Sequence, residues 1–240
     1  MITSLDLIVN GAKTENLPTI EQISQDYKHN SIIMAQGDDN PKLFAWKFLY
    51  TDYLIEASKF WEGQTIVDLG CGRQLDGYII AKIAGASKYV GVDPYNLGRF
   101  YKRLTNQEER IGDKEFNEKI LKVKESIQTI KDYNKEIVAK IINNIDLHLN
   151  GKHLPVALIA EDMVSALRRF PNDSVSIMTA GLDNCIIWRN EYAELAEKEI
   201  SRVLHPRGAY LSIYSRLVPK KLKLDISFES NTFIKFTKSD

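Results

Sequence analysis

Residues 65–94, TIVDLGCGRQLDGYIIAKIAGASKYVGVDP, decide the fold of this chain. The stretch begins with a short apolar run that Gly70 and Gly72 interrupt. It continues with apolar residues at helical spacing and ends with a second β-rich run at Asp93. This order predicts a parallel β-α-β unit with glycines in its first turn. Backbone can approach a ligand closely at such a turn, and a carboxylate at the tip of the second strand can bind paired hydroxyls. The stretch therefore predicts a site for a nucleotide-type cofactor.

The alternation of strand and helix continues along the chain. Strands are expected at 65–70, 88–93, 156–161, 174–180 and 208–214, and helices at 76–84, 162–170 and 191–204. Strands separated by helices indicate a doubly wound, mostly parallel α/β sheet with helices on both faces. Two further β-rich runs, LDISFES and TFIKFTK, predict a C-terminal antiparallel hairpin. We therefore expect seven strands in all, with an antiparallel end to the sheet.

An N-terminal extension precedes this domain. Residues 1–63 are predicted to be a helical extension, and 64–240 the Rossmann-like domain. Thr19 has the capping-box spacing of a helix start, and Asn40-Pro41 is a favourable opening for a longer aromatic-rich helix. The segment between these helices is expected to be a loop that packs on the domain or covers a pocket.

A long insertion separates the second and third core strands. Residues 99–150 greatly exceed the dozen or so that a crossover needs, and their apolar residues recur at spacings of three and four. One amphipathic helix fits this pattern, and so does a helical hairpin broken near Asp132-Tyr133-Asn134. Three roles stay open for the insertion: packing on the domain, a homodimer contact, or a lid over the site.

Composition excludes several classes of function. The 240 residues suffice for one sizeable domain with an embellishment. Lys+Arg and Asp+Glu both number 32, which argues against a protein whose affinity depends on neutralising nucleic-acid phosphates. Cys71 and Cys185 form neither a zinc pattern nor a disulfide framework, so no metal is expected. Without a recognisable secretion signal or a membrane-length apolar run, we expect a soluble, cytoplasmic protein.

The glycine turn resembles a motif of a known family. Asp68-Leu69-Gly70-Cys71-Gly72 is similar to motif I of the class I S-adenosylmethionine-dependent methyltransferases, in which an acidic residue precedes a Gly-x-Gly turn. Val92-Asp93 resembles the second motif, whose carboxylate binds the ribose hydroxyls. Glu161-Asp162-Met163 lies where the family commonly has an acidic residue against the adenine amino group. The resemblance covers 64–240 without the insertion, and includes the antiparallel strand at the end of the sheet.

This resemblance implies a methyltransferase with S-adenosylmethionine as cofactor. The residues that it implies for cofactor binding are Asp68, Gly70, Cys71, Gly72, Asp93, Pro94, Asp162, Met163 and Ala180. Gln74 departs from the fuller family motif, which often has a third glycine there. The departure predicts a differently shaped methionine end of the site.

A dinucleotide fits the same turn less well. The dinucleotide fingerprint G-x-G-x-x-G uses its third glycine for close packing of helix on strand. Here Leu75 occupies that position, and the next glycine is Gly77. Asp68 would lie near a negative pyrophosphate, whereas next to a sulfonium and an α-amino group it is favourable. A Rossmann-like domain that binds neither ligand is the remaining alternative.

The methyl acceptor is harder to read. Methyl transfer requires alignment of nucleophile and methyl group, and a general base only for a weak nucleophile. Asp183 and Asn184, in the loop after the fourth strand, are candidates to orient or deprotonate the acceptor, or are ordinary capping residues. The loop lacks the Asn/Asp-Pro-Pro-Tyr box of some nucleic-acid and protein N-methyltransferases. We expect a small-molecule or peptide acceptor. A nucleic-acid methyltransferase and a non-catalytic binding or scaffold protein remain as alternatives.

Overall fold

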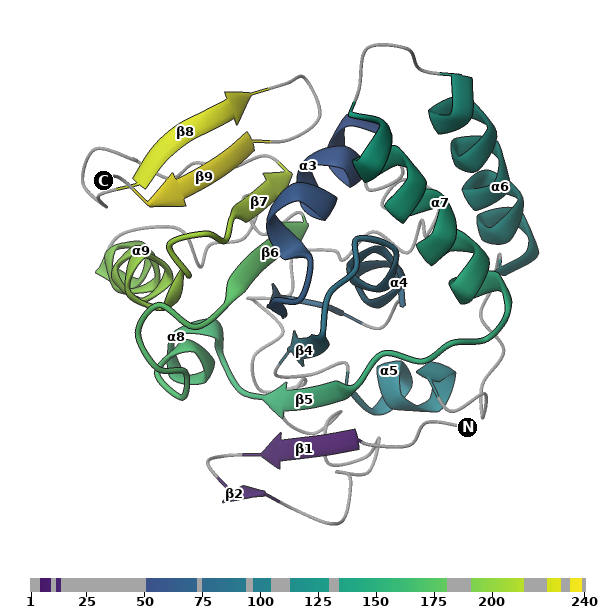
Figure 1. The fold of residues 1–240 in the computed structure, drawn as a ribbon. Coiled ribbons are helices and arrows are strands. Elements are labelled where there is room, and N and C mark those ends of the chain that lie inside the picture. The colour runs from purple at the N-terminus through teal and green to yellow at the C-terminus, as the bar shows by residue number, and fades with distance from the viewer. Residues whose placement is uncertain are drawn as a thin grey trace.

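The structure is a computed structural model built around one mixed β-sheet (Figure 1). It describes residues 5–9, 12–13, 51–72, 75–93, 97–104, 113–129, 134–180, 191–213, 224–229 and 234–238. The strands are β1 (Leu5–Val9), β2 (Ala12–Lys13), β3 (Thr65–Leu69), β4 (Lys88–Val92), β5 (Val156–Ala160), β6 (Ser176–Ala180), β7 (Tyr210–Ile213), β8 (Leu224–Glu229) and β9 (Ile234–Lys238). The helices are α3 (Thr51–Trp61), α4 (Asp76–Ile83), α5 (Leu97–Leu104), α6 (Asp113–Thr129), α7 (Lys135–Leu149), α8 (Met163–Leu167) and α9 (Glu191–Val203).

The strand order creates a switch point in the middle of the sheet. Among the described residues the sheet has nine strands in the order β2-β1-β5-β4-β3-β6-β7-β9-β8. The six from β1 to β7 in this order are mutually parallel, whereas β9 runs antiparallel between β7 and β8. The chain therefore leaves β3 toward β4 on one side and later returns to pair β6 on its other side. In open α/β sheets, ligands bind outside the carboxyl ends of the strands at such a point.

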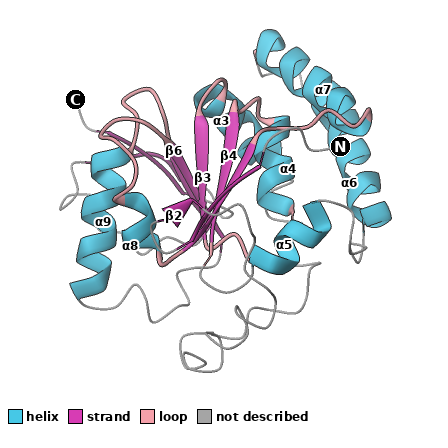
Figure 2. Ribbon diagram, turned by 90° about the horizontal axis from the view of Figure 1, so that it is seen from below, coloured by secondary structure: helices cyan, strands magenta, loops and turns pink. Residues whose placement is uncertain are grey.

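Helices cover both faces of the sheet (Figure 2). One apolar cluster joins α3, α4, α5, α6 and α7 to one face, through side chains such as Ile66 and Leu158. A second cluster joins α8 and α9 to the other face, where Val67 and Ile177 are fully buried. Ile66 and Val67 are adjacent because successive strand residues point to opposite faces. The doubly wound α/β arrangement is thus confirmed, and no helix in the part of the chain described is long and apolar enough to cross a bilayer.

The N-terminal segment differs from its sequence prediction. Residues 5–9 form β1, which pairs in parallel with β5 from Leu5↔Val156 to Val9↔Ala160. The helical extension assigned to 1–63 therefore contributes two strands, and the sheet has nine strands where seven were expected. The N-terminal segment forms a strand because β5 would otherwise be an edge strand, with backbone groups that lack partners on that side. The helix expected to begin at Thr19 lies outside the described residues, and α3 is the described end of the helix expected from Pro41.

The insertion forms a helical hairpin, one of the two alternatives drawn from its pattern. Helices α6 and α7 are separated near Asn134, whose side chain caps α7 by accepting from the Glu136 backbone N–H at 2.8 Å. Ile127 on α6 and Ile141 on α7 are fully buried, and α7 packs against α3 and α4. These contacts favour the packing role. Helix α7 leads directly into β5, so it lies beside the amino edge of the sheet, away from the glycine turn (Figure 1).

A buried ion pair fastens the C-terminal hairpin to α3. The Lys235 ammonium of β9 donates to Glu56 Oε2 at 2.5 Å, and both side chains are less than a tenth exposed. Lys59 donates to the other oxygen, Glu56 Oε1, at 2.5 Å. The Lys235 ammonium also lies 4.2 Å from the centroid of the Phe60 ring. Because both partners are out of water, losing one leaves the other with an uncompensated desolvation cost.

We expect Lys235→Met to lower the free energy of unfolding by about 3 kcal/mol, because Glu56 stays buried with only Lys59 as partner. Adding Glu56→Gln should recover much of this loss. Urea denaturation measures both effects, with Lys124→Met as the control because Lys124 pairs with Asp146 in a more exposed position. A Lys235→Met variant as stable as the control would show that the buried pair does not hold the hairpin.

Candidate functional site

The residues predicted to bind a cofactor meet at the carboxyl edge of the sheet. Gly70 follows β3, Asp93 follows β4 and Asp162 follows β5. Leu69 pairs with Val92 on one side and with Thr179 on the other. Ala180, at the end of β6, therefore lies beside Gly70. The edge that these residues share contains the switch point between β3 and β6, where the topology places a ligand site.

Two left-handed glycines shape the turn after β3. Gly70 has φ +73° and Gly72 has φ +64°, a region that side chains with a Cβ rarely adopt. The Gly70 and Cys71 backbone N–H groups both donate to Val92 O, at 2.8 and 3.1 Å, so the turn is tied to the end of β4. A Cβ added at Gly72 would meet no atom of the described residues within 4 Å. The turn is thus fixed by its glycines, and the described residues leave space next to Gly72.

Asp93 is joined to this turn directly. Its Oδ2 accepts a hydrogen bond from the Gly72 backbone N–H at 3.1 Å. Its own N–H donates to Ile159 O at 3.2 Å, which anchors the tip of β4 to β5. Asp93 is only 7% exposed. This hydrogen bond joins the first predicted motif directly to the second, as the predicted β-α-β unit requires.

The Asp68 side chain lies on the face of the sheet that α4 covers. Its carboxylate accepts from the Tyr89 hydroxyl at 2.6 Å, and it pairs across the strands with Gly91. Asp68 shares the face of Ile66 and lies directly under Gly77 of α4, where an added Cβ would lie 2.0 Å from Asp68 Oδ2. Leu75 was expected from the sequence to keep the helix away from the strand, and the structure corrects this expectation. Gly77, two residues after Leu75, allows α4 to approach β3 closely.

The electrostatics of this carboxyl are unusual. Burial raises the pKa of Asp68 to about 7 from its ordinary 3.8; the Tyr89 hydrogen bond lowers the pKa, and the nearby charge of Asp93 raises it further. Within the described residues no Lys or Arg forms an ion pair with Asp68. Asp68 and Asp93 together make the edge negative, which disfavours a pyrophosphate and favours a cation. The two carboxyl groups that the electrostatic argument used are thus close enough to influence one another in the folded chain.

Cys71 lies between the two strands and is half-buried. A Cβ on Gly91 would approach Cys71 Sγ to 3.0 Å, so Gly91 makes the space that this side chain fills. Burial, followed by the charges of Asp93 and Asp68, raises the pKa of the Cys71 thiol well above its usual value. The thiol is therefore neutral at pH 7 and unsuited to act as a nucleophile. Its role is to fill the turn.

Asp162 and Met163 open α8 at the same edge. Asp162 is exposed, and its Oδ1 accepts from the Val164 and Ser165 backbone N–H groups at 3.0 and 3.1 Å. The side chain is thus a helix N-cap. Met163 is buried. Glu161, next to this cap, is engaged by the Arg169 guanidinium, whose Nε donates at 2.8 Å.

Some predicted residues lie outside the described part of the chain: Pro94, Gln74 and both acceptor candidates, Asp183 and Asn184. Two others were missed by the sequence analysis, namely Tyr89 as the partner of Asp68 and Gly77 as the close approach of α4. A glycine at the second position of a helix, directly after the turn, was the available signal for Gly77. No group of three or more His, Cys, Asp or Glu that could hold a metal occurs among the described residues.

Comparison with known proteins gave matches only among solved structures. No protein-family profile and no curated protein sequence matches the chain. A TehB-like SAM-dependent methyltransferase from Corynebacterium glutamicum is 15% identical with a TM-score of 0.42, covering 92% of this chain and 98% of that one. The rRNA methyltransferase aviRa from Streptomyces viridochromogenes is 13% identical with a TM-score of 0.42, covering 78% and 82%.

A chain from the Haloferax volcanii complex of the Trm112 methyltransferase activator is also similar, at 14% identity and a TM-score of 0.37. The match covers 69% of this chain, which spans about half (51%) of that one. The strand order, the antiparallel β9 and the glycine turn at the switch point are the features that the sequence resemblance to class I S-adenosylmethionine-dependent methyltransferases predicts.

The raised pKa of Asp68 predicts a pH-dependent stability. Because the folded chain holds this proton more tightly than the unfolded chain, the stabilisation is complete below pH 3.8 and is lost as the pH rises through 7. We expect the stability of Asp68→Asn relative to the wild type to increase by about 4 kcal/mol between pH 4 and pH 8. Chemical denaturation across this range, without ligand, measures it. A constant difference would mean that Asp68 titrates normally.

Gly77→Ala tests the close approach of α4. The new methyl group would collide with the Asp68 carboxylate, so α4 must shift away from β3. We expect a loss of about 1–3 kcal/mol in the free energy of unfolding. Gly63→Ala is the contrast. Gly63 has φ +69°, but an added Cβ would have no described atom within 4 Å, so this variant tests backbone strain without a collision. If Gly77→Ala combined with Asp68→Ser is no more stable than Gly77→Ala alone, the collision is not the cause.

Proposed function

We propose that this protein is an S-adenosylmethionine-dependent methyltransferase that binds its cofactor at the carboxyl edge, across the ends of β3 and β4. The hydrogen bond between the Gly72 N–H and Asp93 Oδ2 carries the proposal. It holds a buried carboxylate at the tip of β4 beside the glycine turn and the space that the described residues leave next to Gly72. A ribose whose two hydroxyls donate to Asp93 would have its attached groups within reach of both strand ends.

The charges of the site support the sulfonium cofactor over a dinucleotide. Asp68 is buried beneath the turn, and its raised pKa reports the cost of holding a negative charge there. A cationic group nearby would lower that cost, because opposite charges favour the ionised carboxylate. S-adenosylmethionine supplies a positively charged sulfonium with a transferable methyl group, together with an α-ammonium group. A pyrophosphate would instead raise the cost.

The chain's own contribution to catalysis is positioning. Gly70 and Gly72 allow the backbone close to the cofactor, Asp93 fixes the ribose, and Asp162 or Met163 at the start of α8 borders the adenine. Asp183 and Asn184 are our candidates for orienting the acceptor and receiving its proton. In-line alignment of nucleophile and methyl group accounts for much of the rate in such a reaction.

We propose a small molecule or a peptide as the acceptor. The formal net charge of zero supports this class over nucleic acid. Incubation with methyl-labelled cofactor and separate pools of metabolites, peptides and RNA distinguishes the classes. Label in the metabolite or peptide pool supports the proposal. Label only in RNA would replace it with a nucleic-acid methyltransferase, and tight cofactor binding without any transfer would indicate a binding protein.

The Asp93→Asn variant tests the cofactor site. Calorimetric titration of the wild type should show binding of S-adenosylmethionine and S-adenosylhomocysteine, and none of NAD. Because Asp93→Asn weakens the charge-assisted bonds to the ribose, affinity should fall about 10- to 100-fold while the fold is retained. Glu125→Gln, at an exposed position on α6, is the matched control and should bind like the wild type. Unchanged affinity in Asp93→Asn, or binding of NAD alone, would contradict the site.

A further inference from the structure

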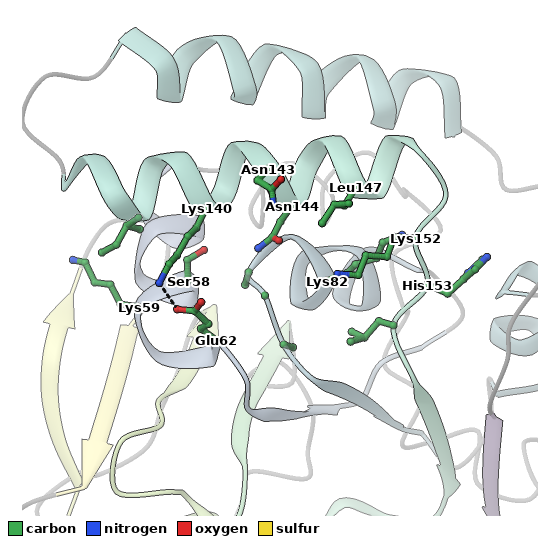
Figure 3. A pocket seen from close by; sticks show the side chains of 15 residues that line it. Ser58, Lys59, Glu62, Lys82, Lys140, Asn143, Asn144, Leu147, Lys152 and His153 are labelled. Atoms are coloured by element: carbon green, nitrogen blue, oxygen red, sulfur yellow. Dashed lines mark hydrogen bonds and ion pairs between the residues drawn. The ribbon is translucent and has the colours of Figure 1, made fainter.

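A cavity lies at the opposite edge of the sheet from the glycine turn. It has a volume of about 370 Å³ and is enclosed by α3, α4, α7 and the residues just before β5 (Figure 3). Gly85 in its wall precedes β4, and His153 precedes β5, so the cavity opens at the amino ends of the strands. This volume is within the range typical of small-molecule sites. The proposed cofactor site does not share residues with it.

The cavity wall carries excess positive charge. Lys59 and Lys140 are paired with Glu56 and Glu62, at 2.5 and 2.9 Å. Two more lysines line the cavity, Lys82 from α4 and Lys152 from the segment before β5, and neither forms an ion pair within the described residues. Both are labelled in Figure 3, in the part of the lining formed by the end of α4 and the segment before β5.

The charge of Lys152 acts on Lys82. Burial and then the charge of Lys152 lower the pKa of Lys82 to about 8. Burial lowers the pKa of His153, and the charge of Lys82 lowers it further. A negative group between these cations would remove the repulsion. Lys82 is held where it is by the Tyr78 ring, whose centroid lies 5.9 Å from the ammonium.

The end of α4 does not oppose an anion here. A helix C-terminus normally presents carbonyl oxygens that repel negative charge. In α4 these oxygens are occupied: Ile80 O by Ala84 N, Ala81 O by Ala86 N and Lys82 O by Gly85 N. Asn144 of α7 donates to the last of them, Ile83 O, at 3.0 Å. The lysine ammonium groups are therefore available to an outside ligand.

We propose that this cavity binds a small organic phosphate, with the phosphate next to Lys82 and Lys152. A phosphate monoester carries a charge near −2 at pH 7, which matches the two lysines. The cavity is larger than inorganic phosphate requires and leaves room for a sugar-sized body. The site is independent of the proposed methyl transfer.

Calorimetric titration with ribose 5-phosphate, ribose, inorganic phosphate and a 12-nucleotide RNA, in 150 mM salt at pH 7, tests the proposal. Ribose 5-phosphate should bind at one site, at least tenfold more tightly than inorganic phosphate, and ribose should not bind. Lys152→Met, at an exposed position, and Lys82→Met should each weaken ribose 5-phosphate at least tenfold. Lys198→Met, on an exposed position of α9, is the control and should leave binding unchanged.

Three results would overturn the proposal. Failure of ribose 5-phosphate to saturate below about 10 mM would leave the cavity without the affinity expected of a ligand site. Equal weakening by Lys198→Met would assign the binding to general charge. Saturable binding of the RNA alone, lost in Lys152→Met, would make this face a nucleic-acid surface. Thermal unfolding of each variant without ligand separates loss of binding from loss of fold.

Discussion

The buried Asp68 carboxyl is the constraint on which the rest of the site depends. It lies at the end of the central strand, accepts from Tyr89 on the neighbouring strand, and requires Gly77 above it. A fully buried carboxyl is costly to ionise, and the raised pKa expresses that cost. The chain accepts this cost at the switch point of its sheet, next to Asp93. Under the proposed function, a cationic cofactor would lower this cost.

The two ends of the sheet thus differ in charge. At the carboxyl edge, Asp68 and Asp93 surround a glycine turn, whereas at the amino edge Lys82 and Lys152 line a cavity under α7. The insertion creates the cavity at the amino edge. Helix α7 supplies one wall of this cavity, and its Asn144 donates to the last backbone oxygen of α4. A chain whose formal net charge is zero therefore has two acidic side chains at one edge of its sheet and two lysines in a cavity at the other.

Local patterns predicted most of the first site. The β-α-β period, the Gly70 and Gly72 turn and the position of Asp93 all lie within thirty consecutive residues. The features that were not predicted depend on contacts between distant segments. Strand β1 pairs with β5, which lies about 150 residues later in the chain. Lys82 and Lys152 line the same cavity because α7 places the segment before β5 near the end of α4. Neither pairing leaves a periodic signal in the sequence.

Proton release on cofactor binding is the most direct test of the account. Calorimetry of S-adenosylmethionine binding at pH 7, in buffers of different ionisation enthalpy, gives the number of protons exchanged. Since the Asp68 pKa is about 7 in the free protein and a cation lowers it, binding should release roughly half a proton. Asp68→Asn should abolish this release. Binding without proton release, or release that persists in Asp68→Asn, would contradict the role given to the buried carboxyl.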